Sequence, residues 1–135
     1  MLRIELPWPD SRLSPNARGH WRIKEKARQA AIDTAYWVTL AEWQKIGKPK
    51  FLGFVKVYMT FCPPRRRSYD DDNLISRMKY LRDGMAKALR VDDGVFRQQA
   101  VEFGQVQKGG KVLVTLEPQV VDVRPRGLGI DGGDA

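Results

Sequence analysis

The sequence has 135 residues, a formal net charge of +8 and a pI near 9.9, and 42% of its residues are hydrophobic. This is the length of one ordinary domain with enough apolar content for a core. A domain this basic often binds a polyanion, most commonly nucleic acid, although a merely soluble basic surface is the alternative. The single cysteine, Cys62, excludes an internal disulfide. No apolar run reaches membrane-spanning length and no signal-peptide pattern opens the chain, so we expect a cytoplasmic or nucleoid-associated protein without a membrane partner.

The first half of the chain predicts a strand, a long helix and a second strand. Residues 2–6 alternate apolar and polar positions, and the prolines of "PWP" end that strand. A turn-rich loop follows, and then a helix is predicted from Trp21 to Ile46, ending at a Gly-Lys-Pro stop signal. Residues 51–61 are β-branched and aromatic, which predicts a strand. The apolar face of the predicted helix is Ala27, Ala31, Thr34, Val38 and Ala41.

The second half predicts another helix and two further strands. The helix covers residues 73–89, and strands are predicted over 97–106 and 111–117, joined as a hairpin by the two glycines of "QKGGK". The apolar stripe of this helix is Leu74, Met78, Leu81, Met85 and Leu89.

The whole pattern predicts an α+β fold in the order β-α-β-α-β-β. We expect a small mixed sheet of about four strands packed with two main helices. Residues 1–118 form the predicted single domain, and residues 119–135, rich in glycine and poor in apolar side chains, are predicted to be a flexible tail.

The stretch "RRRSYDDDNL" places three arginines beside three aspartates. Asp70, Asp71 and Asp72 raise one another's pKa unless a helix N-terminus, the arginines or a divalent cation offsets their repulsion. One aspartate suffices to cap the helix that follows, so three are more than capping requires. Capping and metal binding therefore both remain open for this cluster.

Asp92 and Asp93 form a second acidic pair after the predicted helix. Seventeen helical residues span about 25 Å, so these acids reach the first cluster only if the chain doubles back. A solvent-exposed turn, "DDG", is the simpler interpretation of this pair taken alone.

One face of the predicted helix carries polar groups between the two acidic clusters. Asp72, Ser76, Lys79 and Asp83 are spaced i, i+4, i+7 and i+11, which places them together and away from most of the apolar stripe. Lys79 is either an ordinary ion-pair partner of Asp83 or a cation that stabilises charge developing at a phosphoryl group.

Basic residues occur in two places that suit phosphate binding. With the arginines on phosphates and the aspartates on Mg²⁺, the two clusters fit metal-assisted attack on a phosphodiester. A second basic stretch lies at the start of the first helix, where an exposed, solvated helix face is the alternative interpretation. The candidate DNA-binding residues of the two places are Arg65, Arg66, Arg67, Arg18, His20, Arg22 and Lys26.

These motifs together resemble the RusA family of Holliday junction resolvases and RusA-like phage endonucleases. The family's ordered pattern corresponds here to "RRRSYDDDNL", Lys79, "RDGM" and "VDDGVF", and the opening "LPWPDSRLSPNARGHW" and closing "KGGKVLVTLEP" are also similar. The resemblance covers about residues 2 to 118.

The resemblance implies a homodimeric endodeoxyribonuclease that uses Mg²⁺, which Mn²⁺ can replace, to cut four-way junctions symmetrically. The implied metal ligands are Asp70, Asp72 and Asp93, with Asp92 and Asp71 as secondary candidates. The implied catalytic lysine is Lys79, although the family's spacing also points to the position of Ser76. The loop similarity adds Asn16 to the DNA-binding residues.

Two other functions remain open from the sequence. One is a related nuclease that acts on other branched or replicative DNA. The other is a basic DNA-binding module whose acidic residues are caps or an inactive site.

Overall fold

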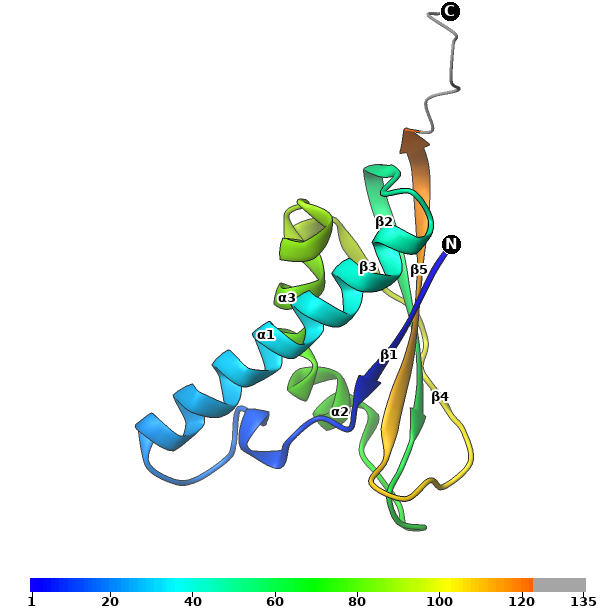
Figure 1. Ribbon diagram of the computed structural model, residues 1–135. Helices are drawn as coiled ribbons and strands as arrows, with labels where there is room; N and C mark the ends of the chain where they lie inside the picture. The colour runs from blue at the N-terminus through cyan, green and yellow to red at the C-terminus, as the bar shows by residue number, and fades with distance from the viewer. Residues whose placement is uncertain (123–135) are drawn as a thin grey trace, which may run out of the picture.

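The structure, a computed structural model, describes residues 1–122 and has α+β architecture (Figure 1). The predicted fold class is confirmed, with a mixed sheet packed against helices that lie on one side of it. Residues 123–135, the larger part of the predicted tail, lie outside the described residues. From the N-terminus the elements are β1 (Leu2–Pro7), η1 (Ser11–Leu13), α1 (Trp21–Lys45), β2 (Lys50–Cys62), α2 (Asp71–Arg77), α3 (Lys79–Leu89), η2 (Asp93–Val95), β3 (Phe96–Gln98), β4 (Glu102–Phe103) and β5 (Lys111–Asp122).

The sheet is built around the long strands β2 and β5, which pair in antiparallel orientation. β1 adds to the other edge of β5 in antiparallel orientation, and β3 and β4 pair in parallel with the other edge of β2. The described residues thus form five strands rather than about four, because the predicted strand over 97–106 is two short strands.

The predicted hairpin between the last two strands is wrong. β4 pairs with β2, and the chain then crosses the end of β2, where the N–H of Gln107 donates to the Pro63 carbonyl at 2.9 Å. Gly109 and Gly110 do supply the positive φ angles of a turn, 79° and 70°. After this turn, β5 pairs with the opposite edge of β2. The β2–β5 pairing is much longer than any pairing with the two-residue strand β4 could be. β5 also extends to Asp122, beyond the predicted end of the domain at residue 118.

Helix α1 begins and ends within one residue of its prediction, but its buried face differs from the predicted one. The predicted face is wrong at Thr34 and Ala41, which are exposed, whereas Val38 is partly buried against the core. The cause is α3, which packs against α1 and selects a row of residues spaced by four. The buried residues are Ala27, Ala31, Ala35, Thr39 and Trp43.

Gly84 shows how closely α3 approaches α1. A Cβ at this position would lie 2.3 Å from the Ile32 carbonyl oxygen and 2.9 Å from the Ala35 Cβ. The glycine that lowers helix propensity is therefore what allows the two helices to touch.

The single helix predicted over 73–89 is two helices that meet at Met78. The Met78 backbone has φ −79° and ψ −5°, and its N–H donates to the Ile75 carbonyl at 3.0 Å instead of continuing a regular helix. The predicted apolar stripe is nevertheless confirmed, because all five of its side chains are buried. None of the helices within residues 1–122 combines the length and apolar character needed to cross a membrane.

Candidate active site

Asp70 is the N-cap of α2, so the capping interpretation is confirmed for this aspartate. Its Oδ1 accepts hydrogen bonds from the N–H groups of Asp72, at 2.9 Å, and Asn73, at 3.4 Å. Asp71 and Asp72 are exposed in the first turn, where the free N–H groups of the helix favour acids. Both cap bonds use one oxygen of Asp70, which leaves its Oδ2 to face solvent or a ligand.

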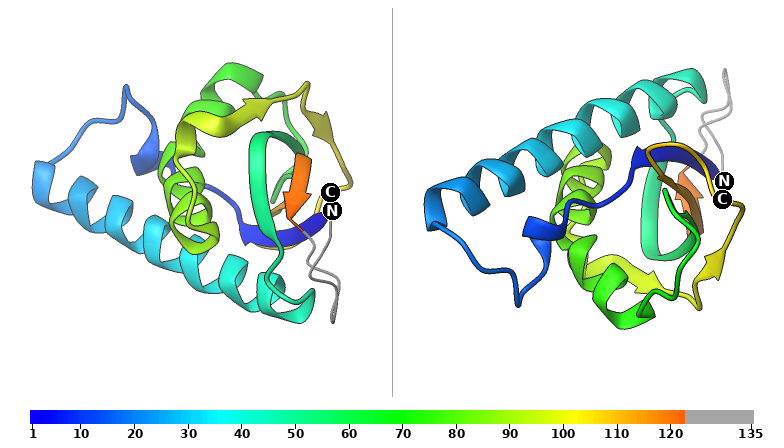
Figure 2. Two further views of the ribbon diagram at one scale, coloured as in Figure 1. Left: turned by 90° about the horizontal axis from the view of Figure 1, so that it is seen from above. Right: turned by 90° about the horizontal axis from the view of Figure 1, so that it is seen from below.

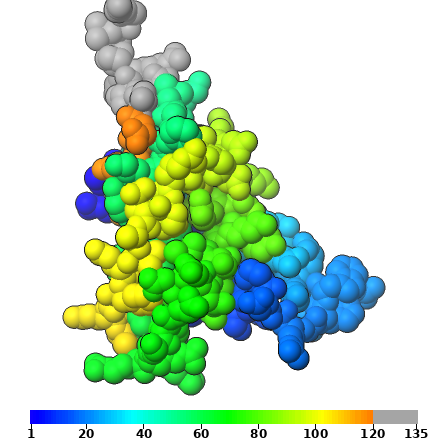
Figure 3. All heavy atoms as spheres, turned by 180° about the vertical axis from the view of Figure 1, so that it is seen from behind, coloured from blue at the N-terminus to red at the C-terminus, as the bar shows by residue number. Residues whose placement is uncertain are grey.

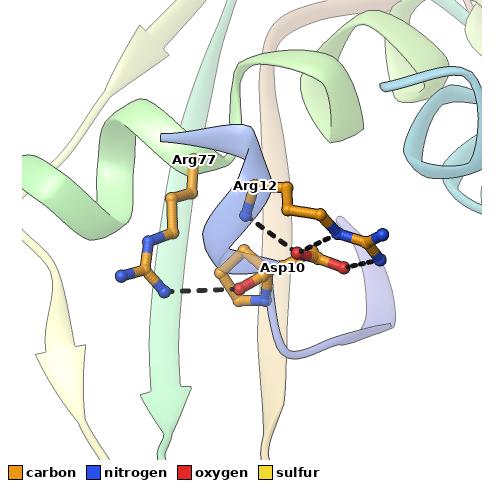
Figure 4. Close-up of polar contacts among 4 residues, drawn as sticks. Asp10, Arg12 and Arg77 are labelled. Atoms are coloured by element: carbon orange, nitrogen blue, oxygen red, sulfur yellow. Dashed lines mark hydrogen bonds and ion pairs between the residues drawn. The ribbon is translucent and has the colours of Figure 1, made fainter. Parts of the chain in front are cut away.

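A polar network holds α2 against the segment that follows β1. Asn73 donates from Nδ2 to the Ser14 hydroxyl at 3.2 Å and accepts from the Arg77 Nε at 3.0 Å. Arg77 also donates to the Pro9 carbonyl at 3.5 Å (Figure 4). This network joins positions that are 59 and 68 residues apart in the chain, so it positions α2 in the fold.

Beside this network, Asp10 and Arg12 form a close ion pair (Figure 4). The Arg12 guanidinium contacts Asp10 Oδ2 at 2.6 Å and Oδ1 at 3.0 Å. The hydrogen bond from Arg12 is the main reason that the pKa of Asp10 lies below its ordinary value, and Arg77 adds a smaller electrostatic contribution. Asp10 is therefore already neutralised within its own segment.

The second acidic cluster meets α3 and not the first cluster. Asp92 caps η2 by accepting from the N–H of Gly94 at 2.8 Å, and Asp93 is the first residue of that turn. Asp93 lies close enough to Asp83 on α3 to act on the pKa of its carboxyl group. Burial first, and then the neighbouring carboxyl group of Asp93, raise the pKa of Asp83 above its ordinary value. The protonated, neutral form of the Asp83 carboxyl group is therefore favoured.

Two cations flank this carboxyl pair. The charges of Lys79 and Arg82 act on Asp83 in the opposite direction and partly lower its pKa. Arg82 is half-buried, and burial lowers its own pKa while the two acids counteract that effect. An arginine remains protonated in proteins, so Arg82 is a permanent cation at this position.

A cavity of about 350 Å³ opens beside these groups, and we call it the acid–base cavity. It brings together the predicted Asp93 and Lys79, and Ser76 lines it as well. The Ser76 hydroxyl donates to the Asp72 carbonyl at 2.8 Å, as is usual for a serine within a helix. Its lining residues are Pro15, Ile75, Ser76, Lys79, Arg82 and Asp93.

The structure does not bring Asp70 and Asp72 into one group with Asp93. Within residues 1–122, no three side chains of the His, Cys, Asp and Glu types gather closely enough to hold a metal ion. Asp93 does come close to α2, because it lines the same cavity as Ser76, and Ser76 is one helical turn from Asp72. The predicted metal ligands Asp70, Asp72 and Asp93 therefore remain a prediction.

Sequence reasoning missed Arg82 and assigned Asp83 only as a partner of Lys79. Among the ion pairs of the described residues, none joins Lys79 to Asp83. The spacing did place Asp83 on the face of Ser76 and Lys79, and Arg82 lies three residues after Lys79 on the same helix. Arg82 and Asp83 matter here because Asp93 lies near both of them. No local sequence pattern shows that Asp93 comes close to this helix.

The predicted DNA-binding residues are exposed in two separate regions. Arg65, Arg66 and Arg67 lie in the loop before α2, and the Arg67 guanidinium is 4.9 Å from the centre of the Tyr69 ring. The second region, with the exposed residues Asn16, Arg18, His20, Arg22 and Lys26, covers the loop before α1 and the first turns of that helix. Figures 1 and 2 show this end of α1 projecting from the body of the molecule.

His20 has a structural role at that projecting end. Its Nδ1 accepts the N–H of Arg22 at 3.1 Å, which makes His20 the N-cap of α1. Trp21 beside it is 66% exposed, with the Arg22 guanidinium 5.5 Å from the ring centre. An exposed ring next to cations suits contact with nucleic acid, and the sequence prediction did not include Trp21.

The fold and these sites define a small α+β protein with a carboxyl pair, two flanking cations and an exposed basic surface. No family model matches the chain. An uncharacterized protein of Xylella fastidiosa (strain Temecula1) is 38% identical over 117 residues, which cover 86% of this chain and 76% of the relative. The chain belongs to the same family as this Xylella protein.

Proposed function

We propose that the protein is a Mg²⁺-dependent endonuclease that hydrolyses a phosphodiester of branched DNA, with the four-way junction as its first candidate substrate. The observation that carries this proposal is the acid–base cavity, which Asp93 lines together with Lys79 and Arg82, and Asp93 also acts on the neighbouring Asp83. Acids and permanent cations in one cavity suit phosphoryl transfer, which needs both a site for a cation and compensation for developing negative charge.

The donor atoms near the cavity fit a hard divalent cation. They are carboxylate oxygens, which Mg²⁺ prefers, and a metal ion would offset the negative charge of Asp93 that helps to raise the pKa of Asp83. Asp93 lines the cavity, and Asp72 and the free Oδ2 of Asp70, which the structure does not bring into one group with Asp93, would have to move closer to complete the site. When bound, the metal polarises the phosphate and lowers the pKa of a coordinated water.

The residues of the chain supply the remaining functions. Lys79 and Arg82 neutralise charge on the phosphoryl group, and this helps most in the transition state, where that charge is largest. Arg65, Arg66 and Arg67 bind neighbouring phosphates from the loop before α2. The resemblance to the RusA family supports the same residues and adds a homodimer that acts in the cytoplasm of a bacterial or phage-infected cell.

A basic DNA-binding module without activity is the second candidate. The observation that favours it is that Asp70 is engaged as a helix cap and that residues 1–122 contain no ready group of three metal ligands. This candidate predicts DNA binding that does not depend on Mg²⁺ and no cleavage under any condition.

A cleavage assay separates the candidates. The protein is incubated with a four-way junction, a flap and a linear duplex of equal length, in Mg²⁺, Mn²⁺, Ca²⁺ or EDTA. We expect nicking of branched DNA in Mg²⁺ and Mn²⁺ and none in EDTA. Nicking restricted to flaps would select the related nuclease, and binding to all three DNAs without any nicking would select the inactive module.

A further inference from the structure

A second cavity, of about 380 Å³, lies at α2 on the side of the loop that precedes it. Trp8 and Tyr69 line it together with Arg65, Arg67 and Arg77, and we call it the aromatic–arginine cleft. No residue lines both this cleft and the acid–base cavity, but α2 contributes Arg77 to the cleft and Ile75 and Ser76 to the cavity. In Figure 3 the residues of α2 and its preceding loop lie between the segment after β1 and the segment between β3 and β5.

The cleft has an excess of positive charge. The ion pairs of the described residues include none of its three arginines Arg65, Arg67 and Arg77. The carboxylate that also lines it, Asp10, is already bound to Arg12. Three guanidinium groups without a carboxylate partner suit an anion that accepts several hydrogen bonds, and a phosphate is such an anion.

Arg77 is held in place before any ligand arrives. Its side chain is half-buried, and its bond to the Asn73 side chain, together with its bond to the Pro9 carbonyl (Figure 4), restricts its orientation. A guanidinium group has five N–H donors, so these two bonds leave others for a ligand.

The aromatic wall of the cleft is also held in place. The Trp8 ring packs edge-on against Phe61 and Tyr69, with ring centres 5.9 and 5.3 Å apart. Gly110 packs closely against Trp8, because a Cβ added at Gly110 would lie 2.9 Å from the Trp8 Cβ. The Tyr69 hydroxyl donates to the Arg65 carbonyl at 3.2 Å, which connects the wall to the arginine loop.

We propose that the aromatic–arginine cleft binds one unpaired nucleotide of a DNA strand. The phosphate contacts Arg67 and Arg77, and the base packs on the Trp8–Tyr69 wall. Aromatic rings beside cations in a groove are the usual means of binding single strands, and a base inside a duplex cannot offer its face in this way. A volume of about 380 Å³ also lies in the range of sites for small molecules.

This inference rests on the proposed function and narrows its substrate class. Because α2 contributes to both cavities, a strand in the cleft continues toward the acid–base cavity. The preferred substrate is then DNA with unpaired nucleotides next to the cleaved bond, as at a flap, a splayed arm or an opened junction centre.

The test measures binding without cleavage, by fluorescence anisotropy in EDTA. The probes are a labelled ten-nucleotide oligothymidine and a blunt duplex of the same length. We expect the wild type to bind the single strand more tightly than the duplex. Arg67→Gln should weaken single-strand binding about fivefold or more. Arg3→Gln is the control, because Arg3 is an exposed arginine of β1 that lines neither cavity and has no proposed role in binding, and it should change binding less than twofold.

A second variant tests the aromatic wall. Tyr69→Leu keeps an apolar side chain but removes the ring, and we expect about a fivefold loss of single-strand affinity with little change for the duplex. Circular dichroism checks folding, and Arg67→Gln removes no hydrogen bond within the described residues, so it tests the cleft even if Tyr69→Leu unfolds.

The outcomes separate this inference from the proposed function. Equal losses for Arg3→Gln and Arg67→Gln, or a duplex bound as tightly as the single strand, would contradict nucleotide binding in the aromatic–arginine cleft. If the protein cleaves junctions but lacks these binding differences, the proposed function stands and nucleotide binding in the cleft is contradicted. If the protein shows the binding differences but cleaves no DNA, nucleotide binding in the cleft stands and the proposed nuclease activity is contradicted.

Discussion

The two cavities at α2 differ in the charges that they combine. The acid–base cavity joins Asp93 to Lys79 and Arg82, so opposite charges lie close together, and burial together with Asp93 raises the pKa of the neighbouring Asp83. In the aromatic–arginine cleft, Asp10 is already paired, and the remaining arginines face aromatic rings. Charges of both signs suit chemistry on a phosphate, whereas unopposed cations and rings suit holding a strand. Variants on either side of α2 should therefore separate cleavage from binding.

Asp93→Asn should have the largest effect, with loss of detectable cleavage and unchanged or tighter DNA binding. The amide coordinates Mg²⁺ poorly, and removing a negative charge favours approach of a polyanion. A nicking assay beside a band-shift assay measures both. Asp92→Asn is the control, because asparagine also caps helices and the cap on η2 should persist. Near-normal nicking by Asp93→Asn would show that the cavity is not the active site.

The second-largest effect distinguishes Lys79 from Ser76 as the position that is essential for catalysis. Lys79→Ala should slow single-turnover cleavage about 100-fold, by analogy with the loss of one preorganised donor. Ser76→Ala should change the rate little, because the Ser76 hydroxyl is bonded to the Asp72 carbonyl.

Two further measurements complete this comparison. Binding of the ten-nucleotide strand should fall less in either variant than in Arg67→Gln, since neither residue lines the aromatic–arginine cleft. A normal rate for Lys79→Ala together with a slow Ser76→Ala would move the essential position one turn back, into α2.

The third effect concerns the start of α2, the helix that contributes to both cavities. Asp70→Ala should lower the free energy of unfolding by about 1 kcal/mol, because it removes the N-cap. Asp70→Asn should retain most of that stability while weakening a metal ligand. Asp71→Ala is the control, since its carboxylate accepts no hydrogen bond within the described residues. Urea titrations measure all three variants, and equal stability of Asp70→Ala and Asp71→Ala would contradict the capping role.

The smallest effect is a pH dependence that arises from the carboxyl pair. The pKa of Asp83 is raised in the folded state, so the folded protein holds a proton that the unfolded chain releases near the ordinary pKa of 3.8. The pair therefore contributes stability below that pH and loses it as the pH rises through the folded pKa. Asp83→Asn should remove this part of the pH dependence and leave stability near neutral pH unchanged or higher. Unfolding curves between pH 3 and 8 test it, and an identical pH profile in both proteins would show that the carboxyl groups are independent.

Local chemistry in the sequence determined much of the helical structure. The bounds of α1 follow from a helix stop signal, the stripe from Leu74 to Leu89 follows from helical periodicity, and Asp70 caps α2 because the N–H groups it binds are its immediate neighbours. Ser76 bonds to a carbonyl one turn away for the same reason. Each of these features depends on contacts within a few residues, so a local pattern is enough to predict it.

Only the tertiary structure decided which residues face one another across the chain. The face that α1 buries depends on the close approach of α3 at Gly84, and β5 passes β4 to reach the other edge of β2. The helix ends at Met78 although its apolar stripe continues through α3, and a periodic pattern shows no such break. The pairing of Asp83 with Asp93 and the arginine cleft beside Trp8 also join separate segments, and the physical reason is the same. Their energies come from packing and charges between segments whose distance in space no local pattern of residues specifies.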